Sequence, residues 1–99
     1  MRKLPGAVRI KGIEYKVVVE AGLKTRDDEG AIGLCCFDQA QIKLEADTPP
    51  DVQWQTFWHE VTHACIRGHA TGEDEFLIDT LAGEMHNVLR QMGFYGKHS

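Results

Sequence analysis

The residues of this chain that most clearly indicate a chemistry are His59, Glu60 and His63, which form the pattern H-E-x-x-H. On an α-helix, residues four apart lie on the same face, so both imidazoles can reach one metal ion. Glu60 projects about 100° further round the helix, where its carboxylate can act on a water molecule without binding the ion. The pattern therefore predicts a zinc site with His59 and His63 as ligands and Glu60 as general base.

A catalytic zinc site needs a third protein ligand and leaves one position open for water. His69 lies six residues after His63, which is the distance found in the motif H-E-x-x-H-x-x-G-x-x-H. That motif has a glycine three residues after its second histidine, where this chain has Ile66, and the glycine here is Gly68. A helix continuing through Ile66 would carry His69 away from the metal, so His69 is kept as the alternative ligand.

Acidic residues further along the chain offer another third ligand. Glu75 and Asp79 are four residues apart in the pattern E-x-x-x-D, so they share one face of a predicted second helix. That face borders the surface where this helix would meet the first one. Three neighbouring acids could take the place of Glu75: Glu73, Asp74 and Glu84.

H-E-x-x-H followed by E-x-x-x-D resembles the gluzincin metallopeptidases. The order of sheet, hairpin, first helix, short loop and acidic second helix over residues 30–92 resembles the compact ImmA/IrrE-like metallopeptidases, which include small phage-encoded ones. The resemblance implies that Glu75 is the third ligand of one zinc ion per chain and that Asp79 accepts the second ring N–H of His59. It also implies a peptide or protein substrate that pairs with an edge strand, within residues 32–37 or 41–45. A regulatory protein partner would suit the same family.

The first half of the chain predicts strands. Apolar and polar residues alternate through residues 8–11 and again, after Gly12, through residues 13–20. Residues 32–37 and 41–45 predict a hairpin around Asp38 and Gln39. We expect these segments to form a small antiparallel sheet.

The second half predicts two helices. Thr48 is the expected cap of the first, with a proline in the first position and Asp51 in the first turn, and Gly68 is its expected end. Six residues form an apolar arc expected to pack on the sheet, opposite the histidines: Trp54, Phe57, Trp58, Val61, Ala64 and Cys65. The second helix is predicted over residues 73–92, with a core stripe of Leu77, Leu81, Met85, Val88, Leu89 and Met92. We expect His86 at the surface and residues from Gly93 onward to be loose.

These elements predict one α+β domain, residues 1–99, in which a sheet packs on two helices. The resemblance implies that they form a minimal zincin-like core. The net charge of -4 over 99 residues shows no excess of basic residues that could bind phosphate groups, so nucleic acid is not an expected partner. No apolar run is long enough to span a bilayer, and residues 1–6 do not begin a signal peptide. The three cysteines lack paired spacing, which favours free thiols in a reducing cytoplasm. The resemblance implies that this is the cytoplasm of a bacterium or a phage-infected cell.

The sequence therefore predicts a zinc-dependent metallopeptidase. The alternative is a regulatory or structural protein that keeps the zinc ion without turnover. A third hypothesis is a zinc hydrolase that acts on a substrate other than protein.

Overall fold

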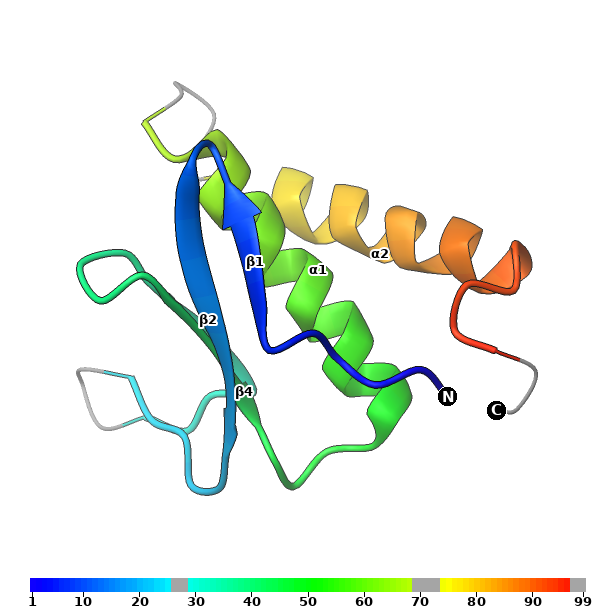
Figure 1. Ribbon diagram of the computed structural model, residues 1–99, viewed down its shortest axis with the longest axis horizontal. Coiled ribbons are helices and arrows are strands. Elements are labelled where there is room, and N and C mark those ends of the chain that lie inside the picture. The colour runs from blue at the N-terminus through cyan, green and yellow to red at the C-terminus, as the bar shows by residue number, and fades with distance from the viewer. Residues whose placement is uncertain (26–28, 69–73, 97–99) are drawn as a thin grey trace.

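The computed structural model describes residues 1–25, 29–68 and 74–96. It has an α+β fold in which helix α1 (Pro50–Ile66) packs on a four-stranded sheet and helix α2 (Glu75–Gln91) packs along α1 (Figure 1). The α+β class and the two helices agree with the prediction. In the described part of the chain, neither helix is long and apolar enough to cross a membrane.

The sheet is mixed rather than antiparallel. Its strands are β1 (Ala7–Ile10), β2 (Ile13–Glu20), β3 (Gly33–Cys36) and β4 (Gln41–Glu45), in the spatial order β1-β2-β4-β3. The β1–β2 and β3–β4 pairs are antiparallel, as expected, but β2 and β4 are parallel. The antiparallel prediction is therefore wrong for the central pair. The chain goes from β2 to the far edge, forms β3, and turns back, so β4 runs in the direction of β2.

This topology decides which strands are edges. The β1 and β3 strands are the two edges, whereas β4 is interior, with Ile42 and Leu44 fully buried. Residues 41–45 therefore cannot receive an added strand, and of the two predicted edge segments only residues 32–37 contain an edge strand. The β1–β2 hairpin turns at Lys11 and Gly12, both with positive φ (53° and 81°), the conformation of a two-residue type I′ turn.

Helix α1 starts and ends close to the predicted positions. Pro50 is its first residue and Asp51 lies in its first turn. The predicted Thr48 cap is wrong: its hydroxyl donates to the Glu45 carbonyl (2.8 Å), and Pro49 occupies the cap position. The helix stops just before Gly68, whose φ of +85° suits a glycine after a helix end.

Helix α2 is capped by Asp74, whose carboxylate accepts a hydrogen bond from the Leu77 N–H (3.1 Å). Its predicted core stripe is largely wrong, although Leu89 of that stripe packs against the main core. The buried residues are Ile78, Ala82 and His86, about one position further round the helix. Four members of the predicted stripe are exposed: Leu81, Met85, Val88 and Met92.

A polar network explains why α2 is turned this way. His86 is fully buried, with Nδ1 2.7 Å from the Tyr95 hydroxyl and Nε2 3.0 Å from an Asp51 carboxylate oxygen. The indole N–H of Trp58 donates to the same Tyr95 hydroxyl (2.7 Å). His86 is thus not a surface residue, because these partners satisfy both ring nitrogens. Tyr95 is buried as well, so the expectation of a loose tail from Gly93 is wrong for the described residues 93–96.

The main core lies between the sheet and the apolar arc of α1. Trp54, Phe57 and Ala64 are buried, as that arc predicted, while Cys65 is exposed. The core cluster consists of Ile10, Tyr15, Ile42, Leu44, Trp54, Phe57, Ala64 and Tyr95.

Candidate metal centre

His59 and His63 of α1 converge with Glu75 from the first turn of α2. One oxygen of Glu75 lies 3.3 Å from His59 Nε2 and 3.2 Å from His63 Nε2, and the other lies 2.9 Å from His63 Nε2. The two imidazole rings are 5.0 Å apart between centroids. One ligand atom from each of the three residues lies within 4.8 Å of the other two, so they form a group able to hold a cation.

These distances agree with the dimensions of a zinc site. Tetrahedral coordination at roughly 2.0–2.2 Å places neighbouring ligand atoms about 3.3–3.5 Å apart. The separations from the shared Glu75 oxygen to both histidine nitrogens are close to that value. The His59 and His63 side chains are each 23% exposed and that of Glu75 is 61% exposed, so solvent reaches the group. Two imidazoles and one carboxylate, open to solvent, are a suitable donor set for zinc.

Asp79 lies one turn after Glu75 on α2, behind His59. Its carboxylate is 3.4 Å from His59 Nδ1, the ring nitrogen that faces away from Glu75. This separation is slightly longer than an ordinary N–H···O hydrogen bond. A carboxylate in this position favours the tautomer with the proton on Nδ1, which leaves Nε2 free to bind a metal.

Glu60 is buried against the edge strand β3, with 7% of its surface exposed. A side chain at Gly33 of β3 would meet Thr56 Cγ2 and would lie 3.0 Å from a Glu60 carboxylate oxygen. Glycine at position 33 therefore allows the backbone of β3 to approach this carboxylate. Burial raises the pKa of Glu60 to about 7; His59 lowers it and Glu75 raises it, both by smaller amounts.

A cavity of about 350 Å³ adjoins this carboxylate between β3, α1 and α2. One part of its wall is formed by His59, Glu60 and Asp79. Another part is formed by Gly33 of β3 and by Ile32, which immediately precedes this strand. The remaining wall is made by Val52, Gln55, Thr56, Ala82 and Gly83. A molecule bound here would lie directly beside the Glu60 carboxylate and His59.

The structure thus brings together the five site residues predicted from the two motifs: His59, Glu60, His63, Glu75 and Asp79. The alternative ligand His69 and the neighbouring acid Glu73 lie outside the described residues. Asp74 is engaged as the cap of α2, and Glu84 lines a different hollow, beside Leu81 and Met85.

The close approach of β3 to Glu60 does not follow from the two motifs. Neither motif contains Gly33 or Thr56, although these residues determine how closely the strand approaches Glu60. A glycine within a short apolar strand is a signal for close backbone approach, and Gly33 carries that signal in the sequence. The partner that approaches it lies 27 residues away in α1, which only the fold reveals.

No family model, curated protein or solved structure matches this chain.

Proposed function

We propose that this protein is a zinc-dependent metallopeptidase with a zincin-like arrangement, in which His59, His63 and Glu75 hold the metal and Glu60 is the general base. The observation that carries the proposal is the convergence of these three donor side chains next to a buried glutamate. The histidines and Glu60 come from one helix and Glu75 from another, so the group depends on the packing of α1 against α2. Free thiols at all three cysteines suit a reducing cytoplasm as its place of action.

A bound zinc ion would supply a Lewis acid that lowers the pKa of water and polarises a carbonyl group. Glu60 would act as the general base, which takes a proton from the attacking water and delivers it to the leaving nitrogen of the peptide bond. Burial beside β3 supports this role, because it holds the carboxylate in place and gives it a pKa of about 7, close to that of an effective base at neutral pH. The nearby cation would move this pKa downward again.

The substrate is proposed to be an extended peptide. β3 is an edge strand, so its outer backbone groups are available to pair with another strand. Gly33 of this strand adjoins Glu60, which would place a paired peptide next to the general base. One substrate side chain would enter the cavity of about 350 Å³ beside His59.

Replacing Glu60 with Gln tests the proposal, because the amide keeps the shape of the side chain but cannot take up a proton. The purified chain would be incubated with zinc and a mixture of peptides, and products followed by mass spectrometry. We expect cleavage by the wild type and a loss of at least about 100-fold in Glu60→Gln, with zinc content unchanged. The matched control is Glu14→Gln, at an exposed position of β2, which should cleave normally.

The second candidate is a regulatory protein that keeps the metal without turnover. The exposure of Asp79 (75%) and Glu75 (61%) favours it, since a site this open excludes water poorly. Zinc-loaded wild type that leaves the peptide mixture intact would support this candidate. It would contradict the peptidase proposal without affecting the assignment of the metal ligands.

A further inference from the structure

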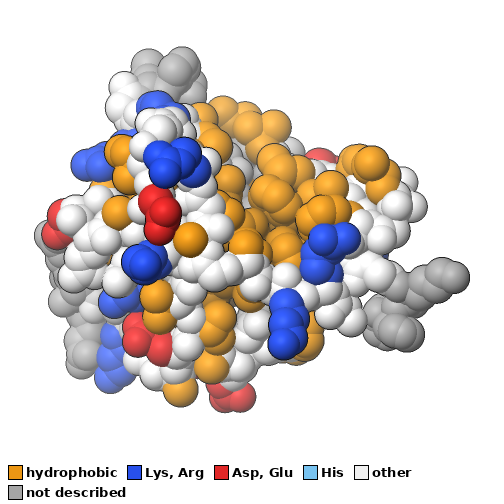
Figure 2. All heavy atoms as spheres, in the orientation of Figure 1, with side chains coloured by type: hydrophobic (Ala, Val, Ile, Leu, Met, Phe, Trp, Pro, Cys, Tyr) orange, Lys and Arg blue, Asp and Glu red, His pale blue; other side chains and the backbone are white. Residues whose placement is uncertain are grey.

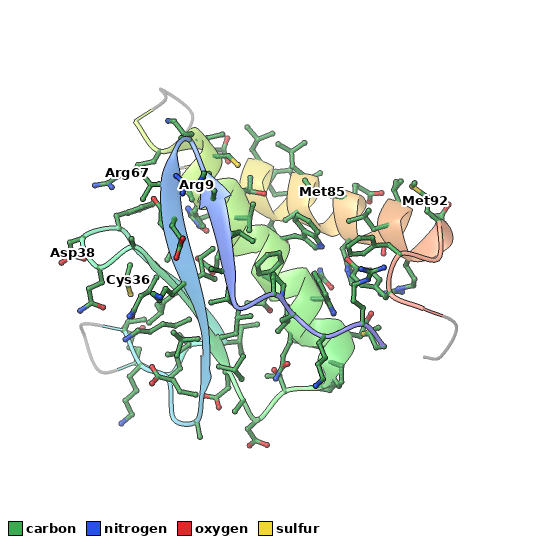
Figure 3. All side chains as sticks on the ribbon, in the orientation of Figure 1. Arg9, Cys36, Asp38, Arg67, Met85 and Met92 are labelled. Carbon is green, nitrogen blue, oxygen red and sulfur yellow. The ribbon has the colours of Figure 1, made fainter. Side chains whose placement is uncertain are left out.

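Helix α2 has an exposed apolar stripe beside its buried face of Ile78, Ala82 and His86. Leu81, Met85, Val88 and Met92 follow one another at spacings of four, three and four residues, and their exposed fractions are 49%, 39%, 52% and 74%. Such spacing places all four on one face of the helix and is the pattern with which helices pack against one another. Figure 3 shows Met85 and Met92 on α2 and Arg9 across from them on β1.

Two hollows adjoin along the side of α1 between α2 and β1. One, of about 540 Å³, lies between α1 and α2 and includes Leu81, Met85 and Val88. The other, of about 600 Å³, lies between α1 and β1 and includes Trp58. Val61 and Cys65 of α1 line both hollows, and the two adjoining hollows together are here called the α1 groove. Figure 2 shows apolar side chains filling the surface between β1 and α2.

The β1 side of the α1 groove is positively charged, although the chain as a whole carries a net charge of -4. Arg2, Lys3, Arg9 and Lys11 line it, and no Asp or Glu among the described residues does so. Arg9 and Lys11 donate to the backbone carbonyls of Gly12 and Arg67, contacts that leave both positive charges in place. On the α2 side the charged lining residue is Glu84. The charges therefore favour an occupant that is acidic on the flank facing β1.

We propose that the α1 groove binds an amphipathic α-helix of a partner protein, with its apolar face in the groove and an acidic flank against β1. The helical form follows from the spacing of the stripe, and the acidic flank follows from the basic border. Helix binding here leaves the metal centre accessible. Val61 comes two residues after His59, and Cys65 comes two residues after His63. Each is therefore about 200° around α1 from its histidine, on the opposite side of the helix. The proposal therefore does not depend on metal binding or on peptidase activity.

Two synthetic peptides test it by fluorescence anisotropy. Both are helical, with leucines at heptad positions; one carries glutamates along one flank and the other carries lysines there. We expect the acidic peptide to bind saturably and at least about tenfold more tightly than the lysine peptide, with the difference shrinking at high salt. Leu81→Gln/Val88→Gln should weaken this binding at least about tenfold, and Lys3→Glu/Arg9→Glu should reverse the preference between the peptides.

The matched control is Val19→Thr, because Val19 is 45% exposed on β2 and does not line the groove. It should bind the acidic peptide as the wild type does, and circular dichroism should show that every variant is folded. Four outcomes would overturn the proposal. They are the absence of saturable binding, equal affinity for the two peptides, a dimer of the chain that Leu81→Gln/Val88→Gln dissociates, and binding to phosphatidylserine vesicles that the same variant abolishes.

Discussion

Gly33 of β3 and Glu60 of α1 face each other so closely that a methyl group on Gly33 would lie 3.0 Å from a carboxylate oxygen of Glu60. The same methyl group would collide with Thr56 Cγ2. This contact joins the edge strand to the proposed general base, and it makes residue 33 sensitive to any added side chain.

Gly33→Ala should therefore destabilise the protein by about 1–3 kcal/mol and shift Glu60, because a packed interface must open to admit the methyl group. Urea unfolding would measure the loss. The control is Gly30→Ala, where an added methyl group meets nothing within 4 Å. Equal stability of the two variants would contradict the close contact.

The buried carboxylate of Glu60 predicts a pH-dependent stability in metal-free protein. Its pKa is raised from 4.5 to about 7, mainly by burial, so the folded state binds more protons than the unfolded state between these values. The contribution of Glu60 to the free energy of unfolding is fully present below pH 4.5 and is lost as the pH rises through 7. Glu60→Gln should remove this dependence.

In the presence of a chelator, the wild type should lose about 2–3 kcal/mol relative to Glu60→Gln between pH 5 and pH 8. Urea unfolding of both proteins at the two pH values gives the difference. Parallel stability profiles for the two proteins would show that Glu60 is not desolvated.

The Tyr95 hydroxyl connects Trp58 and His86 in the interior. Tyr95→Phe removes it and leaves the indole N–H and a ring nitrogen without their partner, which should cost about 1–3 kcal/mol. Thermal or urea unfolding would measure the effect. Tyr15→Phe is the control, since the Tyr15 hydroxyl has no hydrogen-bond partner among the described residues, and it should change stability much less. A negligible effect of Tyr95→Phe would contradict the network.

The cysteines should differ in reactivity. Burial, with smaller contributions from Glu60 and Cys36, raises the pKa of Cys35 to about 12, so almost none of it is thiolate at pH 8. Cys65 is exposed. Iodoacetamide at pH 8 should therefore modify Cys65 well before Cys35, as peptide mass mapping would show. Equal rates at the two sites would mean that Cys35 is less buried than the fold implies.

Local patterns were sufficient to predict the elements and most of the candidate site. The spacing of His59 and His63 depends only on helix geometry, and the E-x-x-x-D pattern placed Glu75 and Asp79 on one face. The parallel pairing of β2 with β4 was not predictable in this way, because the order of strands separated by long loops is not encoded by alternation. The face that α2 buries was also missed. His86 is polar, and its burial depends on Asp51 and Tyr95, one of which lies 35 residues away.

Zinc content of the purified chain, compared between the wild type and Glu75→Ala, tests the metal centre most directly. The exposed acid Glu84 on the same helix provides the control, Glu84→Ala. We expect about one zinc ion per chain in the wild type and the control, and a large loss of zinc in Glu75→Ala, since one of three protein ligands is removed. Unchanged zinc in Glu75→Ala, or no zinc in the wild type, would contradict the account, because the short His–Glu distances would then be explained by hydrogen bonds alone.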